Sequence, residues 1–352
     1  MNTIELPDGR RIGEGEPCFI VAEIGQNHDG DAYNAVRLIK VAHDAGVDAV
    51  KFCKRDIESD LTRAARDAPY TGMHSFGATY GEHREALELT GDELAFIKKR
   101  MVELNKWPEV LFATACDIKS VDVLEEAIDP PLYKIASRDI DNLPLVDYVA
   151  RLGKPVVLSA GMTWKPCGAE DVERAIVHIR QYHQKIIVLQ CTSNYPTKNE
   201  DVGLPRIEQI RQDYGVLTGL SDHTSGIVMA QAAAARGAVM VEKHITHARM
   251  LKGTDHACSL EPDGIRRLVR NIRAVEAAMQ TTVPDVSEAR AKLARSLVTT
   301  RPIPQGETIT ESHLCLKSPG TGYGWHQRDE VIGRRVKVTL PADVTIEAKD
   351  LE

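Results

Sequence analysis

Two histidines in the second half of the chain each end an apolar run, and they are the first candidates for chemistry. His223 ends VLTGLSDH and His244 ends VMVEKH, with Asp222 and Glu242 beside them. Neutral imidazoles are common ligands of Zn²⁺, Mn²⁺ and similar divalent metals. A lone histidine is more often structural, but two at the ends of consecutive runs predict a metal site with open positions for a substrate.

Two lysines occupy similar runs in the first half of the chain. Lys51 lies in VDAVKF and Lys134 in LYKIAS, and a lysine in an apolar strand is unfavourable unless it is paired or functional. One interpretation is a class I aldolase, in which a desolvated Lys134 forms a Schiff base. The other is an anion-binding cage, completed by the hydroxyl residues of neighbouring runs, which are Thr114, Ser137, Ser159, Ser193 and Ser221. So many hydroxyls favour a cage that holds a phosphate and a carboxylate together, as in phosphoenolpyruvate. Lysines lying along the outside of the fold are the structural alternative.

Glu23 ends the first apolar run, FIVAE. Facing a metal and an anion, a carboxylate can orient a water molecule or stabilise developing positive charge. An ion pair with a lysine is the structural alternative for this residue.

The elements that must position these side chains follow from the spacing of the runs. Eight short apolar runs, FIVAE, DAVKF, LFAT, LYKIAS, VVLS, IIVLQCTS, VLTGLSDH and VMVEKH, are separated largely by helical patterns. One such pattern places apolar residues from Ala35 to Ala45 at helical spacing and stops at Gly46, a plausible C-cap. The alternation predicts an α/β fold, the (β/α)8 TIM barrel, whose active site lies at the C-terminal ends of its strands. Because the polar residues fall at those ends, we expect an enzyme.

The composition fits a soluble globular protein and argues against two classes of partner. Of 352 residues, 27% are charged, and the net charge of −7 comes without a basic tract, so no nucleic-acid partner is expected. No apolar stretch approaches the ~18 residues of a membrane span. The seven cysteines are odd in number, lack CxxC spacing and follow no signal peptide, so we expect a reducing cytoplasm.

Two parts of the chain depart from the alternation of apolar runs and helical patterns. Residues 54–90 are polar and weakly periodic, which is typical of a lid or binding loop; a disordered insertion is the alternative. After a linker over 281–295, IPQGETITESHL matches LPADVTIEAKDL when residue 303 is aligned with residue 340. We therefore predict a catalytic barrel over 1–280 and a small β-rich domain over 296–352.

Taken together, the runs resemble the sialic acid synthase family, the phosphoenolpyruvate-dependent nonulosonate synthases. The resemblance covers nearly the whole chain and rests on FIVAEIGQNH, VKF, FAT, YKIAS, VLSAGM, QCTSNYP, LSDHTSG, VEKHIT and KGTDHACSLEP, in this order. The tail resembles the family's C-terminal antifreeze-like (SAF) domain. PYTGMHSFGATYGEH looks closest to the animal-type N-acetylneuraminate synthases.

The resemblance implies a reaction and a role for each candidate residue. Phosphoenolpyruvate would condense with open-chain N-acetylmannosamine or its 6-phosphate, giving N-acetylneuraminate or its 9-phosphate, and phosphate would leave by C–O cleavage. His223 and His244 would hold Mn²⁺, or another divalent metal such as Mg²⁺ or Co²⁺, with Glu242 nearby and Glu23 as the catalytic carboxylate. The residues expected to hold phosphoenolpyruvate are Lys51, Thr114, Lys134, Ser137, Ser159, Ser193 and Ser221. Those expected to face the sugar are Cys53, Tyr195 and Asp255. The family also implies a domain-swapped homodimer.

Three positions depart from the family pattern and leave the sugar open. Cys53 stands where members commonly carry Gln, Ser193 replaces an Asn of many bacterial members, and Ser318 replaces an Arg. A deaminated neuraminate, legionaminate or pseudaminate type of product is therefore the alternative. A sugar 6-phosphate would be bound by Lys54, Arg55 or Lys252. A non-catalytic binding protein is a further alternative, which the complete set of candidate catalytic residues disfavours.

Overall fold

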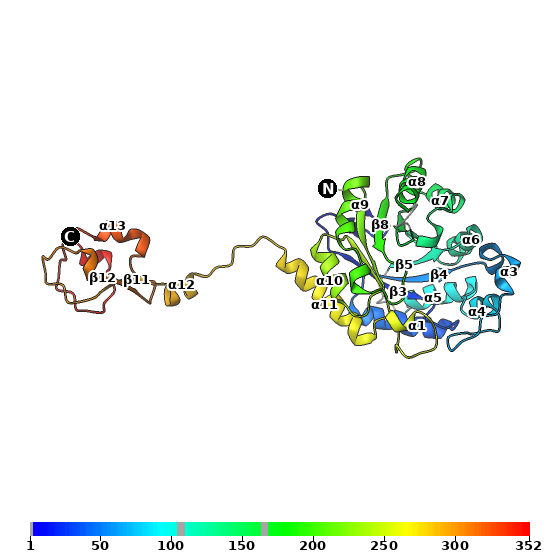
Figure 1. The fold of residues 1–352 in the computed structure, drawn as a ribbon, viewed down its shortest axis with the longest axis horizontal. Coiled ribbons are helices and arrows are strands. Elements are labelled where there is room, and N and C mark those ends of the chain that lie inside the picture. Colours follow the sequence, from blue (N-terminus) through cyan, green and yellow to red (C-terminus); the bar gives the residue numbers. More distant parts are fainter. Residues whose placement is uncertain (1–2, 104–109, 163–167) are drawn as a thin grey trace. The chain divides into compact units, whose positions relative to one another are not determined.

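The computed structural model describes residues 3–103, 110–162 and 168–352. The chain divides into two compact units, Met1–Gln280 and Thr281–Glu352 (Figure 1). The first unit contains a closed barrel of parallel strands surrounded by helices, which confirms the predicted fold class.

The predicted strands all form, and they close the barrel in chain order. Their order is β10-β3-β4-β5-β6-β7-β8-β9, with each neighbouring pair parallel. The strands are β3 Phe19–Gly25, β4 Ala49–Lys54, β5 Val110–Ala115, β6 Tyr133–Ile135, β7 Val156–Ser159, β8 Ile186–Cys191, β9 Leu217–Asp222 and β10 Met240–His244.

Helices alternate with these strands. The first, α1, starts after Asp31, whose carboxylate accepts the Tyr33 N–H, and ends at Gly46 in the left-handed conformation, as predicted. Gly46 suits this position because φ is 77° there. Helix α1 spans Ala32–Ala45. The other long helices between strands are α5 Gly91–Glu103, α6 Ile118–Ala127, α7 Leu143–Arg151, α8 Gly168–Arg180, α9 Pro205–Tyr214 and α10 Val228–Ala235. Helix α11 (Pro262–Ala278) follows β10.

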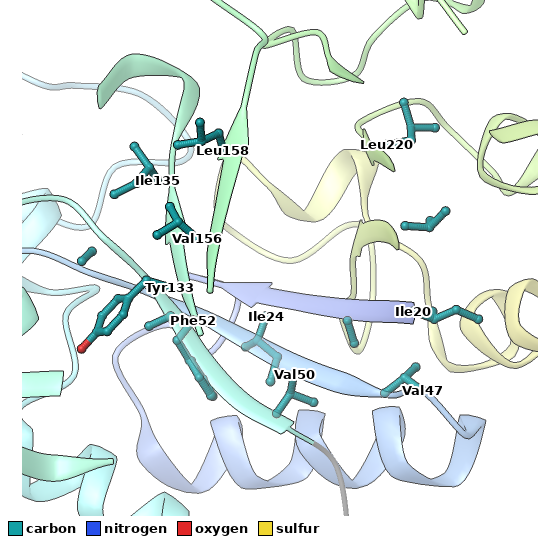
Figure 2. Packing of buried hydrophobic residues seen from close by; sticks show 14 of the residues in the cluster. Ile20, Ile24, Val47, Val50, Phe52, Tyr133, Ile135, Val156, Leu158 and Leu220 are labelled. Carbon is teal, nitrogen blue, oxygen red and sulfur yellow. The ribbon is translucent and has the colours of Figure 1, made fainter. Parts of the chain in front are cut away.

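Alternation along the strands separates two apolar clusters. Side chains of one strand face, such as Ile24 and Phe52, pack with the helices in a large cluster, part of which Figure 2 shows. Side chains of the opposite face, such as Val21 and Phe112, form a second, inner cluster. Because successive side chains alternate between faces, Glu23 shares the inner face of its strand with Val21. The site residues therefore form the layer above the inner core.

A hairpin that the sequence analysis did not predict precedes the barrel. Its strands, β1 (Thr3–Glu5) and β2 (Arg11–Gly13), pair antiparallel and place Ile4 opposite Ile12. Both side chains are buried in the inner cluster together with Phe19, the first residue of β3. The hairpin therefore covers the N-terminal end of the barrel, away from the polar strand ends.

Residues 54–90 form short helices after β4, in contrast to the disordered alternative. The helices are α2 Ile57–Asp60, α3 Arg63–Arg66 and α4 Tyr80–Glu85. The Arg84 guanidinium donates to Gln26 Oε1 over 2.6 Å, and the Gly253 N–H donates to His74 Nδ1 over 3.2 Å. These bonds attach the segment to the loops that follow β3 and β10.

The second unit has its own apolar cluster and an internal symmetry that matches the sequence repeat. Its elements are α12 Ser287–Leu293, β11 Ser296–Thr299, β12 Leu314–Lys317 and α13 Arg328–Val331, with β11 and β12 antiparallel. The equivalent residues Ile303 and Leu340 exchange two backbone hydrogen bonds of 2.9 Å. Ile309 and Ile346, also equivalent, are both fully buried in this unit's cluster. The repeat therefore builds two halves of one small core.

Over residues 3–103, 110–162 and 168–352, no helix combines the length and the apolar character needed to cross a bilayer.

Candidate active site

A pocket of about 370 Å³ opens at the C-terminal ends of the barrel strands. Apart from the candidates for a sugar phosphate, every residue that the sequence predicted for the site lines it. These residues are Glu23, Lys51, Cys53, Thr114, Lys134, Ser137, Ser159, Ser193, Tyr195, Ser221, His223, Glu242, His244 and Asp255. They come from all eight strands or the turns that follow them, so the barrel brings together groups that are far apart in the chain.

Four charged side chains form a connected cluster at the bottom of the pocket. Lys51 is ion-paired with Glu23 and lies 3.6 Å from Glu242, and Lys134 donates to both oxygens of Glu242 over 3.1 and 3.2 Å. Each of these side chains is only 4% exposed. The cluster is charge-balanced when all four groups are ionised, which offsets part of the desolvation penalty.

Two hydroxyls complete this cluster. Lys51 Nζ donates to Thr114 Oγ1 over 2.8 Å, and the Ser221 hydroxyl donates to Glu242 Oε1 over 2.9 Å. Both bonds orient the charged groups toward the same small volume.

The two carboxylates of the cluster differ in proton affinity. Burial raises the pKa of Glu23 to about 8, because the neighbouring Glu242 adds to the effect and Lys51 only partly opposes it. Burial acts in the same direction on Glu242, but the ammonium groups of Lys134 and Lys51 outweigh it and hold the pKa of Glu242 well below its usual range. Glu23 can therefore carry a proton near neutral pH while Glu242 stays ionised.

Hydroxyls and one glycine line the wall beside the lysines. The Gly161 N–H donates to Ser137 Oγ over 2.9 Å, and Ser159 Oγ is buried without a hydrogen-bond partner among the described residues. A Cβ at Gly161 would lie 2.5 Å from Ser193 Oγ and 2.8 Å from Ser137 Oγ. Only glycine leaves this space open, and the hydroxyls around it suit an anion.

The two predicted metal ligands face each other across the pocket. The ring centroids of His223 and His244 are 5.4 Å apart, and the Tyr195 ring lies 4.1 Å from His223 and 5.8 Å from His244. His223 Nδ1 is 3.1 Å from the Thr192 carbonyl, a contact that fixes the ring's orientation.

The donor set of this pair suits an open metal site. Burial lowers the pKa of His244 to about 4, so the ring is neutral at physiological pH, and its Nδ1 is buried without a partner in the described part of the chain. No group of three or more His, Cys, Asp or Glu side chains among the described residues is placed to hold a metal. The two imidazoles could therefore hold a divalent ion only with substrate or water as further ligands.

The pocket also contains cations that the sequence analysis missed or left as one option of several. The sequence analysis did not predict three of the residues that line it, Arg84, Arg138 and Cys116. Of the three candidates for a sugar phosphate, Arg55 lines the pocket, although it also pairs with Glu88 at 2.8 Å. Lys54 pairs with the same carboxylate at 3.1 Å and Lys252 lies over the Phe76 ring, and neither is among the residues that line the pocket. The sequence could have predicted Cys116 as a pocket residue, because it lies two positions after Thr114 and so shares its strand face.

The charge of the pocket differs from that of the chain. Among the described lining residues, the cations Lys51, Arg55, Arg84, Lys134 and Arg138 outnumber the carboxylates Glu23, Glu242 and Asp255. A locally positive pocket in a chain of net charge −7 favours an anionic ligand.

The fold and pocket define a barrel enzyme whose pocket lies at the C-terminal ends of the strands, followed by a second small domain. A model of the NeuB family matches residues 38–284, and a model of the SAF domain matches residues 294–352. The chain therefore belongs to the NeuB family, the sialic acid and related nonulosonate synthases, as its motifs indicated.

Similar proteins place the chain within this family. Human N-acetylneuraminate-9-phosphate synthase is 36% identical, over 97% of this chain and 95% of its own length. The N,N'-diacetyllegionaminic acid synthase of Legionella pneumophila is 30% identical, over 95% and 94%. The crystal structure of the N-acetylneuraminic acid synthetase of Leptospira borgpetersenii, in complex with citrate, superposes with a TM-score of 0.69 at 31% identity and covers 82% of this chain and 94% of that chain. These relatives share one fold and differ in the sugar acid that their names specify.

Proposed function

We propose that this protein condenses phosphoenolpyruvate with N-acetylmannosamine 6-phosphate, giving N-acetylneuraminate 9-phosphate and phosphate. The observation that carries the proposal is the excess of cations in the pocket, with two buried lysines at its base and three guanidinium groups around them. Phosphoenolpyruvate supplies a phosphate and a carboxylate for the base, and the sugar phosphate supplies a further anion for the guanidinium groups.

Lys51 and Lys134 hold phosphoenolpyruvate in this proposal, together with the hydroxyls of Thr114, Ser137, Ser159, Ser193 and Ser221. In the free protein Lys51 pairs with Glu23 and Lys134 pairs with Glu242. Their positions are therefore fixed before the anion arrives, which lowers the cost of organising the site during the reaction.

Glu23 acts on the water in the second half of the reaction. C3 of phosphoenolpyruvate forms the new bond to the sugar aldehyde, water then adds at C2, and the C–O bond to phosphate breaks. Burial raises the pKa of Glu23 to about 8, so its ionised form is a stronger base than an ordinary carboxylate and can accept the proton of this water.

His223 and His244 would hold Mn²⁺ or another divalent ion, such as Mg²⁺ or Co²⁺, in the same pocket. The bound ion would supply a Lewis acid for the aldehyde oxygen. Tyr195 packs on the His223 ring, which keeps that ring in place, and Asp255 lines the neighbouring wall.

Three smaller features complete the proposal. Asp255, Tyr195 and Cys53 face the sugar, and Arg55, Arg84 and Arg138 receive its 6-phosphate. We also propose that the enzyme works in the cytoplasm, which the free thiols of the described cysteines support, and as a domain-swapped homodimer.

Phosphate release tests the proposal. The protein is treated with EDTA, supplied with Mn²⁺ and phosphoenolpyruvate, and offered N-acetylmannosamine, its 6-phosphate or mannose 6-phosphate. We expect metal-dependent release with N-acetylmannosamine 6-phosphate. Turnover with the unphosphorylated sugar alone would refute the phosphate assignment, and turnover with none of the three would favour the alternative, a legionaminate- or pseudaminate-type synthase. His244→Ala should lose bound metal and turnover together, and unchanged metal content would remove His244 from the ligand set.

A further inference from the structure

Two thiols in the wall of the pocket are in contact. Cys53 Sγ lies 3.5 Å from Cys116 Sγ, and both residues line the active-site pocket. Cys53 is half-buried and Cys116 is buried. Among the cysteines that the structure describes, these are the two whose sulfur atoms contact each other. The synthase reaction proposed above has no need for a second thiol.

The backbone places the two cysteines on neighbouring chain segments. Cys53 lies in β4 opposite Thr114 of β5, and the Cys116 N–H donates to the Lys54 carbonyl over 3.1 Å. The two chain segments are therefore still paired at the level of the thiols. Because Cys116 lies two positions after Thr114, it is a diagonal neighbour of Cys53, and such neighbours lie about 7–8 Å apart. A disulfide requires Cα atoms about 4.4–6.8 Å apart, so closing the contact needs a shift of the chain just after β5 as well as rotation of the side chains.

Cations around Cys53 make it the reactive member of the pair. The Arg55 guanidinium donates to Cys53 Sγ over 3.1 Å, and Arg138 and Lys51 line the same pocket. The hydrogen bond from Cys116, together with these cations, holds the pKa of the Cys53 thiol well below its usual range despite burial. The same contact raises the pKa of Cys116. A thiolate beside a thiol is the arrangement of a redox-sensitive cysteine with its resolving partner.

The other described cysteines differ from this pair. Burial raises the pKa of the Cys18 thiol and brings the pKa of Cys258 to about 12, so both stay protonated. Cys315 is partly exposed but lies in the second unit, outside the barrel.

Cys191 also lines the pocket, and although burial opposes the effect, the neighbouring His223 lowers the pKa of its thiol. Its sulfur lies 3.8 Å from His223 Nδ1 and has no second thiol beside it among the described cysteines. Disulfide formation in the barrel is therefore expected at Cys53 and Cys116.

We propose that Cys53 and Cys116 form a peroxide-sensitive dithiol that closes to a disulfide and lowers the activity of the site. The Cys53 thiolate attacks hydrogen peroxide, the O–O bond breaks, hydroxide leaves, and the sulfur becomes a sulfenic acid. Cys116 then attacks this sulfur, the S–S bond forms, the S–O bond breaks, and water leaves with the Cys116 proton. Two electrons pass from the sulfur atoms to peroxide, and a thiol reductant such as dithiothreitol reverses the change.

The effect on turnover rests on the function proposed above. The disulfide removes the negative charge that Arg55 contacts, and it draws the Cys53 sulfur toward β5, away from the position where it faces the sugar. A displacement of this size next to a bound substrate lowers turnover by about tenfold to a hundredfold.

Intact-mass and peptide analysis of the full-length protein tests the dithiol independently of its activity. With a small excess of hydrogen peroxide, the wild-type protein should lose the mass of two hydrogen atoms and give a linked peptide containing Cys53 and Cys116. The Cys116→Ser variant should instead retain a sulfenic acid at Cys53 that dimedone labels. The control variant Cys315→Ser should form the disulfide as the wild type does.

The outcomes separate this inference from the proposed function. Failure of the wild type to form the linked peptide, or labelling spread over all cysteines, would overturn the dithiol. If the protein with the disulfide releases phosphate as fast as its reduced form, the proposal that the disulfide lowers activity is overturned. If the reduced protein releases no phosphate, the proposed function fails, and the mass measurement still decides whether the dithiol exists.

Discussion

Replacing Glu242 by Gln separates an anion-binding site from a purely structural ion-pair network. The substitution keeps the shape of the side chain and removes the negative charge that faces Lys134 at 3.1 Å and Lys51 at 3.6 Å. The free variant then buries two ammonium groups against one remaining carboxylate, that of Glu23. Phosphoenolpyruvate would supply the missing negative charge, so it should stabilise the variant more than the wild type.

The structure sets the size of the effect. Removing one partner of a buried ion pair costs about 3–5 kcal/mol. For a unit of this size, 1 kcal/mol corresponds to about 2 °C in melting temperature, so the free variant should melt about 6–10 °C below the wild type. A ligand at about 100 times its Kd adds about 2.7 kcal/mol, and each tenfold gain in affinity adds about 1.4 kcal/mol more.

The assay is thermal unfolding with EDTA present, with and without phosphoenolpyruvate. Asp222→Asn is the matched control, because Asp222 pairs with the fully buried Lys243 at 2.9 Å. Both variants should lose similar stability, but phosphoenolpyruvate should restore more to Glu242→Gln, by about 2 °C or more beyond the wild-type shift. Equal ligand shifts in all three proteins would refute the role of the lysines as the anion site.

Three further predictions follow from other parts of the molecule. Gly161→Ala should fold normally but lose affinity for phosphoenolpyruvate by at least about tenfold, because the new Cβ enters the space beside Ser193 Oγ at 2.5 Å; unchanged binding by calorimetry would contradict the cradle. Burial raises the pKa of Glu23 from 4.5 to about 8, so its contribution to stability is complete below pH 4.5 and is lost as the pH rises through 8. In urea unfolding, the stability of the wild type relative to Glu23→Gln should therefore decrease between about pH 5 and about pH 9, and a constant difference would rule out the raised pKa. Deleting residues 284–352 should leave a folded barrel, because the two units have separate apolar clusters, with strongly reduced synthase activity; full activity of the truncated protein would show that the second unit is dispensable.

The barrel was predictable because its signal is strong in the sequence. Each predicted strand ends close to its observed end, as FIVAE does within β3 (Phe19–Gly25), and Gly46 terminates α1 as expected. The β1–β2 hairpin escaped prediction because its strands have three residues each, too few for alternation to be recognised. Its place is decided by Ile4 and Ile12, which fill the end of the inner cluster, and this contact is not local in the chain.

The candidate site also contains residues that the sequence predicted and residues that it did not. Residues on strands were found because their polarity interrupts an apolar run, as at Lys134. Arg55, Arg84 and Arg138 lie outside such runs, where a charged residue is ordinary and gives no signal. Only the packing of the segment after β4 brings Arg84 to the pocket, through its bond to Gln26. The sequence therefore predicted the polar residues at the base of the pocket better than the guanidinium groups that also line it.

The difference between the strand residues and the guanidinium groups has a physical cause that also bears on substrate specificity. In β3 and β5, a site residue stands two positions after a residue of the inner core, as Glu23 follows Val21 and Thr114 follows Phe112. The residues at the bottom of the pocket are therefore held as rigidly as the barrel core, because moving Thr114 requires moving the packed layer beneath it. The guanidinium groups stand on the connections between strands, with Arg84 in the short helix α4, and such connections tolerate substitution without loss of the core. Under the function proposed above, a family built in this way can exchange one sugar for another by changing residues of these connections and single wall positions such as Cys53, while the lysine and carboxylate cluster that binds phosphoenolpyruvate stays fixed.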